Sequence, residues 1–426
     1  MKKRMLAVAI SLALGAQAAV AAEANQAPKV QQGNPDLERK IDVLTEEVEK
    51  LKSSMTLPEK TEMKSVYGLG PAASKVYGVS RGLSIGGYGE GYYQNLVSDK
   101  GTGANKADFL RLVTYIGYKF TDKLIFNSEI EFEHGSTGKG GEVSVEFAYL
   151  DYLFNPAFNV RAGMVLVPMG LINEYHEPVF FNSVLRPQVE QTVIPTTWRE
   201  IGAGAFGELA PGLTYKAYVL NGMNASGFSA DGIRSGRQNG AQARAEDLAF
   251  VARLDYTPTL GLTVGGSVYT GNSGQNQVIA GQRPDARLNL YELHGVWQYR
   301  GLELKALGAV GNIGDANVLS TGKAVNAAVP ERFYGWYTEA GYDVLPLLKK
   351  DSTQSLIPFV RYERYNTQDE VPAGFTPNRA KDIELWVAGV NYKPHPQVAI
   401  KADYRNFEPQ AGTKADEVNL GVAFVF

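Results

Sequence analysis

The chain has 426 residues and a formal net charge of −3, so length alone allows two ordinary domains or one large β-barrel. A mean hydropathy of −0.20 and 20% charged residues argue against a helical membrane protein. The absence of cysteine excludes disulfides, thiolate metal sites, covalent c-type haem attachment and a lipidated N-terminal cysteine. We expect no cofactor.

The N-terminus has the three regions of a secretory signal peptide. Residues 2–4 are basic, an apolar run follows them, and the run closes on small residues at Ala21 and Ala22. This pattern predicts a signal peptide over residues 1–22, which is removed when the protein leaves the cytoplasm. A retained membrane anchor is the alternative interpretation.

A short flexible segment is expected at 23–33, and a heptad pattern follows it at 34–56. The apolar a and d positions are Leu37, Ile41, Leu44, Val48, Leu51 and Met55. Such a pattern predicts a short coiled-coil helix through which copies of the chain associate. A single amphipathic helix packed on a barrel rim would show the same spacing. Residues 57–81, which contain Pro58 and Pro71, are predicted to form a linker.

From residue 82 to the C-terminus, apolar and polar residues alternate in pieces of about ten, which is typical of transmembrane β-strands. The last piece is the clearest, because Val418, Leu420, Val422, Phe424 and Phe426 all share one face. Sixteen strands are expected. Their predicted starts lie near residues 82, 107, 123, 142, 158, 196, 212, 246, 261, 285, 301, 331, 354, 382, 396 and 416.

The connections between these pieces alternate between short turns and long polar loops. The long loops are expected at about 96–106, 134–141, 167–195, 222–245, 271–284, 312–331, 367–381 and 407–415. This alternation is how outer-membrane barrels are built. We therefore predict an all-β fold over residues 82–426, an antiparallel transmembrane barrel of about 16 strands in the bacterial outer membrane. A soluble β-sandwich or propeller is less favoured, because no repeat of fixed period occurs.

The strand faces assigned to the barrel interior carry charges of both signs in nearly equal number. The candidate pore-lining residues are Arg111, Glu129, Glu131, Glu133, Arg161, Arg253, Asp255, Arg361, Glu363, Lys401 and Arg405. One interpretation is that these charges pair with one another and keep the lumen hydrated. The other is that two opposed charged walls create a transverse field across the lumen.

Histidine gives no sign of a metal site or of a hydrolase. The four histidines are His134, His176, His294 and His395, which lie far apart, and no H-E-x-x-H pattern occurs. His134 next to Gly135 and Ser136 is the nearest candidate for a catalytic group, but no orienting residue accompanies it. We expect neither a metal site nor an enzyme.

Two stretches resemble the phosphate-selective porin O/P family over about fifty residues: "FNVRAGMVLVPMGLINEYHEP" at 158–178 and "VIPTTWREIGAGAFGEL" at 193–209. The matching positions are Arg161, Gly163, Pro168, Gly170, Asn173, Pro195, Trp198 and Gly202. The resemblance implies a sixteen-stranded, trimeric, anion-selective barrel whose third outer loop folds into the lumen. On that basis the loop at 167–195 is the candidate constriction loop, and its candidate residues are Glu174, His176, Glu177, Arg186 and Glu190.

The function expected from these observations is a passive outer-membrane channel for small hydrophilic solutes and ions, with anion or phosphate selectivity as the finer expectation. Its expected partners are outer-membrane lipid, small ions or solutes, and further copies of the chain, with a trimer implied by the resemblance. No nucleic acid is expected. The alternative is a structural tether or adhesin that uses the coiled coil and the outer loops and conducts little.

Overall fold

The computed structural model describes residues 39–40, 42–47, 63–97 and 103–426. The chain divides into two units, residues 1–59 and 60–426. In the first unit, residues 39–40 and 42–47 are helical. The other positions of the predicted coiled coil lie outside the described residues, as do the predicted signal peptide and the segment at 23–33. Pairing between coiled-coil helices therefore stays a prediction.

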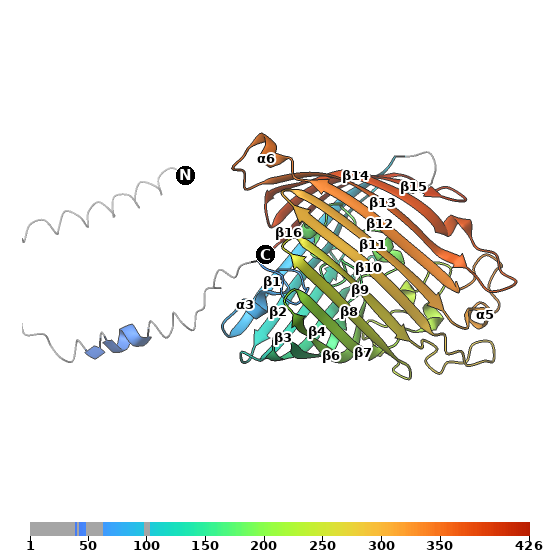
Figure 1. Ribbon diagram of the computed structural model, residues 1–426, viewed down its shortest axis with the longest axis horizontal. Helices are drawn as coiled ribbons and strands as arrows, with labels where there is room; N and C mark the ends of the chain where they lie inside the picture. The colour runs from blue at the N-terminus through green and yellow to red at the C-terminus, as the bar shows by residue number, and fades with distance from the viewer. Residues whose placement is uncertain (1–38, 41, 48–62, 98–102) are drawn as a thin grey trace, which may run out of the picture. The chain divides into compact units, whose positions relative to one another are not determined.

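Within residues 63–97 and 103–426, sixteen antiparallel strands form one closed barrel (Figure 1). The strands are β1 Gly82–Leu96, β2 Lys106–Lys119, β3 Leu124–Glu133, β4 Val143–Asn155, β5 Phe158–Leu166, β6 Arg199–Ala210, β7 Leu213–Asn221, β8 Leu248–Thr259, β9 Leu262–Gly271, β10 Leu288–Tyr299, β11 Leu302–Ile313, β12 Arg332–Tyr342, β13 Ser355–Glu370, β14 Asp382–His395, β15 Val398–Pro409 and β16 Glu417–Val425. The predicted barrel is confirmed, and every predicted strand start lies within three residues of the observed one.

The barrel closes where the last strand pairs with the first. Tyr88 of β1 lies opposite Val425 of β16, and the register continues to Leu96 opposite Glu417. Every strand therefore has two hydrogen-bonded neighbours, and no sheet edge is left to pair with another chain. The last strand of the sequence, β16, is the closing strand.

The alternation of side chains along each strand separates an apolar outer face from a polar interior. On β16, Leu420 and Val422 are 52% and 51% exposed, whereas Asn419 and Ala423, one position before and after them, are buried. Large exposed apolar side chains recur around the barrel, and this is the surface that lipid covers in a transmembrane barrel. Among the described residues, no helix combines the length and the apolar character needed to cross a bilayer.

Short and long connections alternate, so all the short ones lie at one end of the barrel. The longest of the others is the 167–198 connection between β5 and β6. Within the described chain, the connections contain only short helices. These are η1 Pro178–Phe180, α4 Val189–Thr192, η2 Ala225–Gly227, η3 Arg234–Gly236, α5 Ala316–Leu319, α6 Leu345–Leu348 and η4 Arg379–Lys381.

Residues 63–81 pack into the barrel unit, which differs from the predicted linker at 57–81. This segment carries the short helix α3 Lys75–Gly78, and Leu69, Ala72, Ala73 and Val76 are at most 3% exposed. Asn127 on the inner face of β3 donates a hydrogen bond to the carbonyl of Ala73 over 2.8 Å. The small residues of "GLGPAAS" let the backbone lie close to the barrel wall. A flexible linker has a similar composition, so the sequence did not show that this segment packs.

The lipid-facing assignment predicts how a charge on β16 affects folding. We expect Val422→Arg to lower the free energy of unfolding in lipid by about 2–4 kcal/mol, which is a destabilisation. Val422 lies mid-strand on the outer face, so a charge there would face hydrocarbon. Urea-induced unfolding in lipid vesicles measures this, with Val422→Ala as the matched control. Equal losses in the two variants would contradict the assignment.

Candidate functional site

The connection between β5 and β6, residues 167–198, crosses the interior of the barrel. Lys401 on β15 donates hydrogen bonds to the carbonyls of Pro178 and Ser183 over 2.5 and 3.0 Å. Glu129 on β3 contacts His176 of the same loop, with 3.0 Å between the carboxylate oxygen and Nε2. Because these strands belong to different parts of one closed wall, a loop that contacts both lies inside the barrel. We call residues 167–198 the internal loop.

The base of the internal loop is closed by one asparagine. The side-chain amide of Asn173 donates to the carbonyls of Val167 and Trp198 over 2.7 and 2.8 Å, and its oxygen accepts from the Trp198 amide over 2.7 Å. These three hydrogen bonds tie together the two ends of the loop. Gly170 has a φ of +75°, and a Cβ there would lie 2.5 Å from the Glu190 carboxylate. Asn173, Trp198 and Gly170 are all positions of the family resemblance.

Two glutamates of the internal loop are attached to different parts of the barrel unit. Glu174 pairs with Lys216 on β7, over 2.5 Å between carboxylate and ammonium. Glu177 accepts hydrogen bonds from the backbone amides of Ala72 and Ala73 over 2.9 and 3.0 Å. The internal loop is therefore fixed both to the barrel wall and to the segment that precedes β1.

The three other candidate constriction residues are also buried. Glu190 accepts from the Tyr337 hydroxyl on β12 over 2.6 Å and from the Ile172 amide over 2.7 Å. His176 is 2% exposed and Arg186 is 7% exposed. Among the described residues, Nε and Nη2 of Arg186 have no hydrogen-bond partner. The structure thus places Glu174, His176, Glu177 and Glu190 as attachment points of the internal loop, and all five residues are buried.

The candidate pore-lining residues lie on the inner faces of their strands, but most of them are covered. Those less than 9% exposed are Arg111, Glu129, Glu131, Arg161, Arg361, Glu363, Lys401 and Arg405. The exceptions are Glu133, Arg253 and Asp255, which are partly exposed. The internal loop and residues 63–81 occupy the space beside these charges, which is why so few of them reach the aqueous lumen.

The buried charges are arranged in pairs. Arg161 lies 2.8 Å from Asp151, and Arg361 lies 2.8 Å from Glu339 and 2.9 Å from Glu363. The other pairs are Arg111 with Glu90 and Glu131, Arg253 with Asp255, Lys305 with Glu303, and Arg405 with Glu417. This agrees with the first of the two sequence interpretations, because neighbours of opposite sign cancel most of each other's field. Arg361 and Glu363 contact the internal loop at Ser183 and Val189, whereas Arg253 and Asp255 stay partly exposed.

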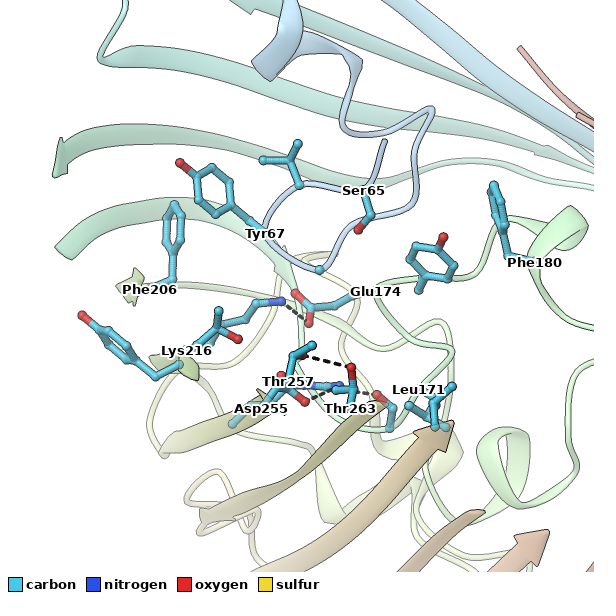
Figure 2. Close-up of a pocket in the computed structure, with 18 of the residues that line it drawn as sticks. Ser65, Tyr67, Leu171, Glu174, Phe180, Phe206, Lys216, Asp255, Thr257 and Thr263 are labelled. Carbon is cyan, nitrogen blue, oxygen red and sulfur yellow. Dashed lines mark hydrogen bonds and ion pairs between the residues drawn. The ribbon is translucent and has the colours of Figure 1, made fainter. Parts of the chain in front are cut away.

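A cavity of about 1150 Å³ lies below the internal loop, toward the end of the barrel with the short connections. Asp122, Lys123 and Pro156 of those connections line its mouth. Glu174 and Lys216 point toward each other in its wall, and Asp255 lies next to them (Figure 2). The charged groups deeper in the cavity are Arg253, Lys305, Arg361, Lys393, Glu303 and Glu339.

A second cavity of about 390 Å³ is lined by Gln188 and Thr192 of the internal loop together with Tyr365 and Lys414. Pro187, one residue before Gln188, lines the first cavity. Residues 187–192 of the internal loop therefore lie between the two cavities.

Sequence reasoning missed the partners of the internal loop more than the loop itself. Three wall residues that contact the internal loop were not among the sequence candidates: Lys216, Tyr337 and Glu146. Lys216 could have been found, because it is the one charged residue of the alternating "LTYKAYVLN". Glu146 could not be found by alternation. It is an extra residue in the strand next to Phe147, so two consecutive side chains are buried.

No protein-family model matches the chain. A protein of Aquifex aeolicus (strain VF5), described as "Uncharacterized protein", is 40% identical over 368 residues. The match covers 83% of this chain and 82% of the relative. That coverage includes most of the barrel, so the two proteins are related over their main folded unit.

Solved structures share the fold. The outer membrane channel DcaP of Acinetobacter baumannii has a TM-score of 0.55 at 14% identity, covering 81% of this chain and 97% of its own. OmpT, an outer membrane protein of Vibrio cholerae, solved in a trimer form, has a TM-score of 0.50 at 12% identity, covering 82% and 100%. At these identities the likeness shows the fold alone, which is that of the outer-membrane porins.

Removing the Asn173 side chain is expected to loosen the base of the internal loop. Asn173→Ala removes three buried hydrogen bonds and leaves their backbone partners unpaired, so we expect a loss of about 3–5 kcal/mol in unfolding free energy. Hydrogen exchange of the Trp198 amide should accelerate strongly. Asn276→Ala, on an exposed loop, is the matched control. Unchanged protection of the Trp198 amide in Asn173→Ala would contradict the role of Asn173 in closing the base of the internal loop.

Burial of Glu190 predicts that acid stabilises the internal loop. Burial raises the pKa of this carboxyl from 4.5 to about 7, and hydrogen bonds from Tyr337 and Ile172 oppose the shift only in part. The folded state therefore holds the proton more tightly than the unfolded state. Stability is highest below pH 4.5 and falls as the pH rises toward 7, by up to about 3 kcal/mol.

Denaturant unfolding in detergent at pH 5 and pH 8 measures this dependence. We expect Glu190→Gln to flatten it, because the amide does not ionise. Glu246→Gln, at an exposed loop position, should leave the slope as it is in the wild type. A slope that Glu190→Gln does not change would assign the pH dependence to other groups.

Proposed function

Because the chain belongs to the same family as the Aquifex aeolicus protein and has the outer-membrane porin fold, we propose that it is a passive outer-membrane channel for small hydrophilic solutes and ions. One observation carries the proposal: a closed sixteen-stranded barrel with an apolar exterior holds two cavities separated by residues 187–192 of an internal loop. A barrel of this size leaves an aqueous lumen, and a loop inside it narrows the passage.

The proposed mechanism is diffusion through water, limited at residues 187–192. Most charges beside the passage are paired, as Arg361 is with Glu339 and Glu363, so they contribute little net field. Size is therefore the main filter. No residue has to react with the solute, which is why we assign no enzymatic activity.

A modest preference for anions is the finer part of the proposal. It is supported by basic groups whose nearest partners carry no charge. Lys401 donates to two backbone carbonyls, Lys393 lies 5.8 Å from the ring centroid of Phe180, and Lys414 lies 3.7 Å from that of Phe407. Phosphate as the preferred anion rests on the family resemblance.

Self-association is part of the same proposal. The heptad pattern at 34–56 supports self-association without fixing the number of copies. A trimer is supported by the resemblance and by the trimer form in which the OmpT neighbour was solved. Cross-linking in native membranes, followed by denaturing electrophoresis, would count the copies.

Single-channel recording in a planar bilayer with a KCl gradient tests the function. We expect stable conductance and a reversal potential that favours chloride, with inorganic phosphate blocking the current. Lys393→Gln should shift the reversal potential toward zero, because it removes a cation from the larger cavity. Lys350→Gln, at an exposed position of the connection between β12 and β13, is the matched control.

The outcomes separate the parts of the proposal. A reversal potential at zero or favouring potassium would leave a channel without anion or phosphate selectivity. No conductance from well-folded protein would overturn the channel and favour a structural tether.

A further inference from the structure

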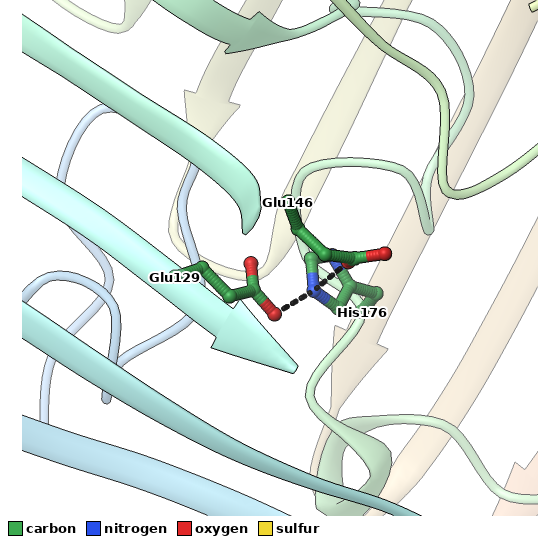
Figure 3. Close-up of side chains that lie close together, drawn as sticks. All are labelled: Glu129, Glu146 and His176. Atoms are coloured by element: carbon green, nitrogen blue, oxygen red, sulfur yellow. Dashed lines mark hydrogen bonds and ion pairs between the residues drawn. The ribbon is translucent and has the colours of Figure 1, made fainter. Parts of the chain in front are cut away.

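Three buried side chains meet where the internal loop touches the wall formed by β3 and β4. Glu129 comes from β3, Glu146 from β4 and His176 from the loop (Figure 3). Nε2 of His176 lies 3.0 Å from a Glu129 oxygen and 3.6 Å from a Glu146 oxygen. One ligand atom from each residue lies within 4.8 Å of the other two. The glutamates are 0% exposed and the histidine is 2% exposed.

The hydrogen bond at the other ring nitrogen decides what His176 presents to these carboxylates. Nδ1 lies 2.9 Å from the carbonyl oxygen of Asn173, which can only accept, so Nδ1 carries a hydrogen. In a neutral imidazole, Nε2 then has a lone pair directed at two carboxylates. Three electron-pair donors converge on one point, so a cation is favoured there: a proton on Nε2 or a metal ion.

The remaining oxygens of the two glutamates favour a metal ion. Oε1 of Glu146 is occupied by the guanidinium of Arg199 over 3.0 Å. Within the described part of the chain, Oε2 of Glu129 and Oε2 of Glu146 are buried and have no hydrogen-bond partner. A proton on Nε2 satisfies at most one oxygen well, whereas an ion bound between the groups draws on both carboxylates. Unpaired buried carboxylate oxygens are costly and rarely retained without such a partner.

The backbone is distorted at this point in a way that brings Glu146 inward. The register between β3 and β4 pairs Glu129 with Phe147 but Ile130 with Val145, so Glu146 is the extra residue of a β-bulge. Regular alternation would send either Glu146 or Phe147 to the lipid face, yet both are fully buried. Bulges of this kind redirect a side chain and are common beside functional sites.

From these observations we propose that Glu129, Glu146 and His176 bind one divalent transition-metal ion, with Zn²⁺ as the best fit, and that this ion fastens the internal loop to the barrel wall. One imidazole nitrogen and two carboxylate oxygens are ordinary zinc ligands. Bonds of about 2.0–2.1 Å in a tetrahedron place ligand atoms about 3.4 Å apart, and the two measured separations lie on either side of that value.

The surroundings have the features of a supporting shell. The Asn173 carbonyl fixes the tautomer of His176, which is the usual second-shell arrangement of a metal-bound histidine. The ring of Tyr88 packs edge-on against His176 with 5.9 Å between ring centroids. Glu131, the next inward carboxylate on β3, is held by Arg111 over 2.9 Å. The sequence predicted no metal site because its histidines are far apart, and here the ligands come from three separate elements.

Direct metal binding tests the proposal. Tag-free full-length protein, folded in detergent without metal, should bind one Zn²⁺ per chain after dialysis, as measured by elemental analysis. Co²⁺ in its place should give the visible absorption of a four-coordinate ion. We expect Glu146→Gln and His176→Gln each to weaken Zn²⁺ binding at least tenfold. Glu133→Gln and His134→Gln, which change the same residue types outside the cluster, should bind as the wild type does.

Zn²⁺ binding by wild type that is no tighter than binding by Glu146→Gln would overturn the proposal and leave a protonated His176 in the cluster. Should the variants fail to fold, X-ray absorption at the zinc edge of the wild type decides the question. One imidazole with oxygen ligands supports the site, and two or more imidazoles place the metal elsewhere and refute it. None of these readings depends on conductance.

Discussion

A closed barrel of sixteen strands encloses more volume than its own inward side chains can fill, and the rest of this structure follows from how that volume is occupied. The outer face needs only apolar residues against lipid. The inner face must either stay hydrated or be covered by other parts of the same chain. Here the internal loop and residues 63–81 cover much of it, so inner-face residues such as Glu129 and Arg361 are almost fully buried.

Covering a charged wall imposes strict pairing. An ionised side chain removed from water is unfavourable unless a partner of opposite charge and further hydrogen bonds compensate it. The structure meets this condition with short contacts, such as Arg161 with Asp151 and Lys216 with Glu174. Glu174 with Lys216 joins the loop to the wall, whereas Arg161 with Asp151 joins two wall strands. Some of the pairs that neutralise charge therefore also hold the loop in place.

This arrangement explains why a narrow passage can be built from charged residues without a strong field. Residues 187–192 line both cavities, and their neighbours include Glu363, which is paired with Arg361, and Lys414. A cluster with surplus carboxylates, such as that of Glu129 and Glu146, calls for a further cation, and the histidine of the loop is placed to share it. Size selection and loop attachment then depend on the same few contacts.

The sequence by itself determined the barrel, its strand count and nearly all of its strand boundaries. Period-two alternation and short turns are local properties, and each strand displays its own apolar face regardless of what lies inside the barrel. β16 could be assigned to the wall from ten residues alone. The position of the internal loop was anticipated only through the family resemblance, since its composition resembles that of other long loops.

The tertiary structure alone decided which charges are covered and what they contact. Arg361 contacts Ser183, 178 positions away in the sequence, and no local pattern encodes such a pair. The packed state of residues 63–81 likewise depends on a wall formed later in the chain. The bulge that turns Glu146 inward breaks the very alternation by which faces are assigned from sequence. Local periodicity determines strands, whereas burial, pairing and ligand clusters arise only when distant segments share one enclosed space.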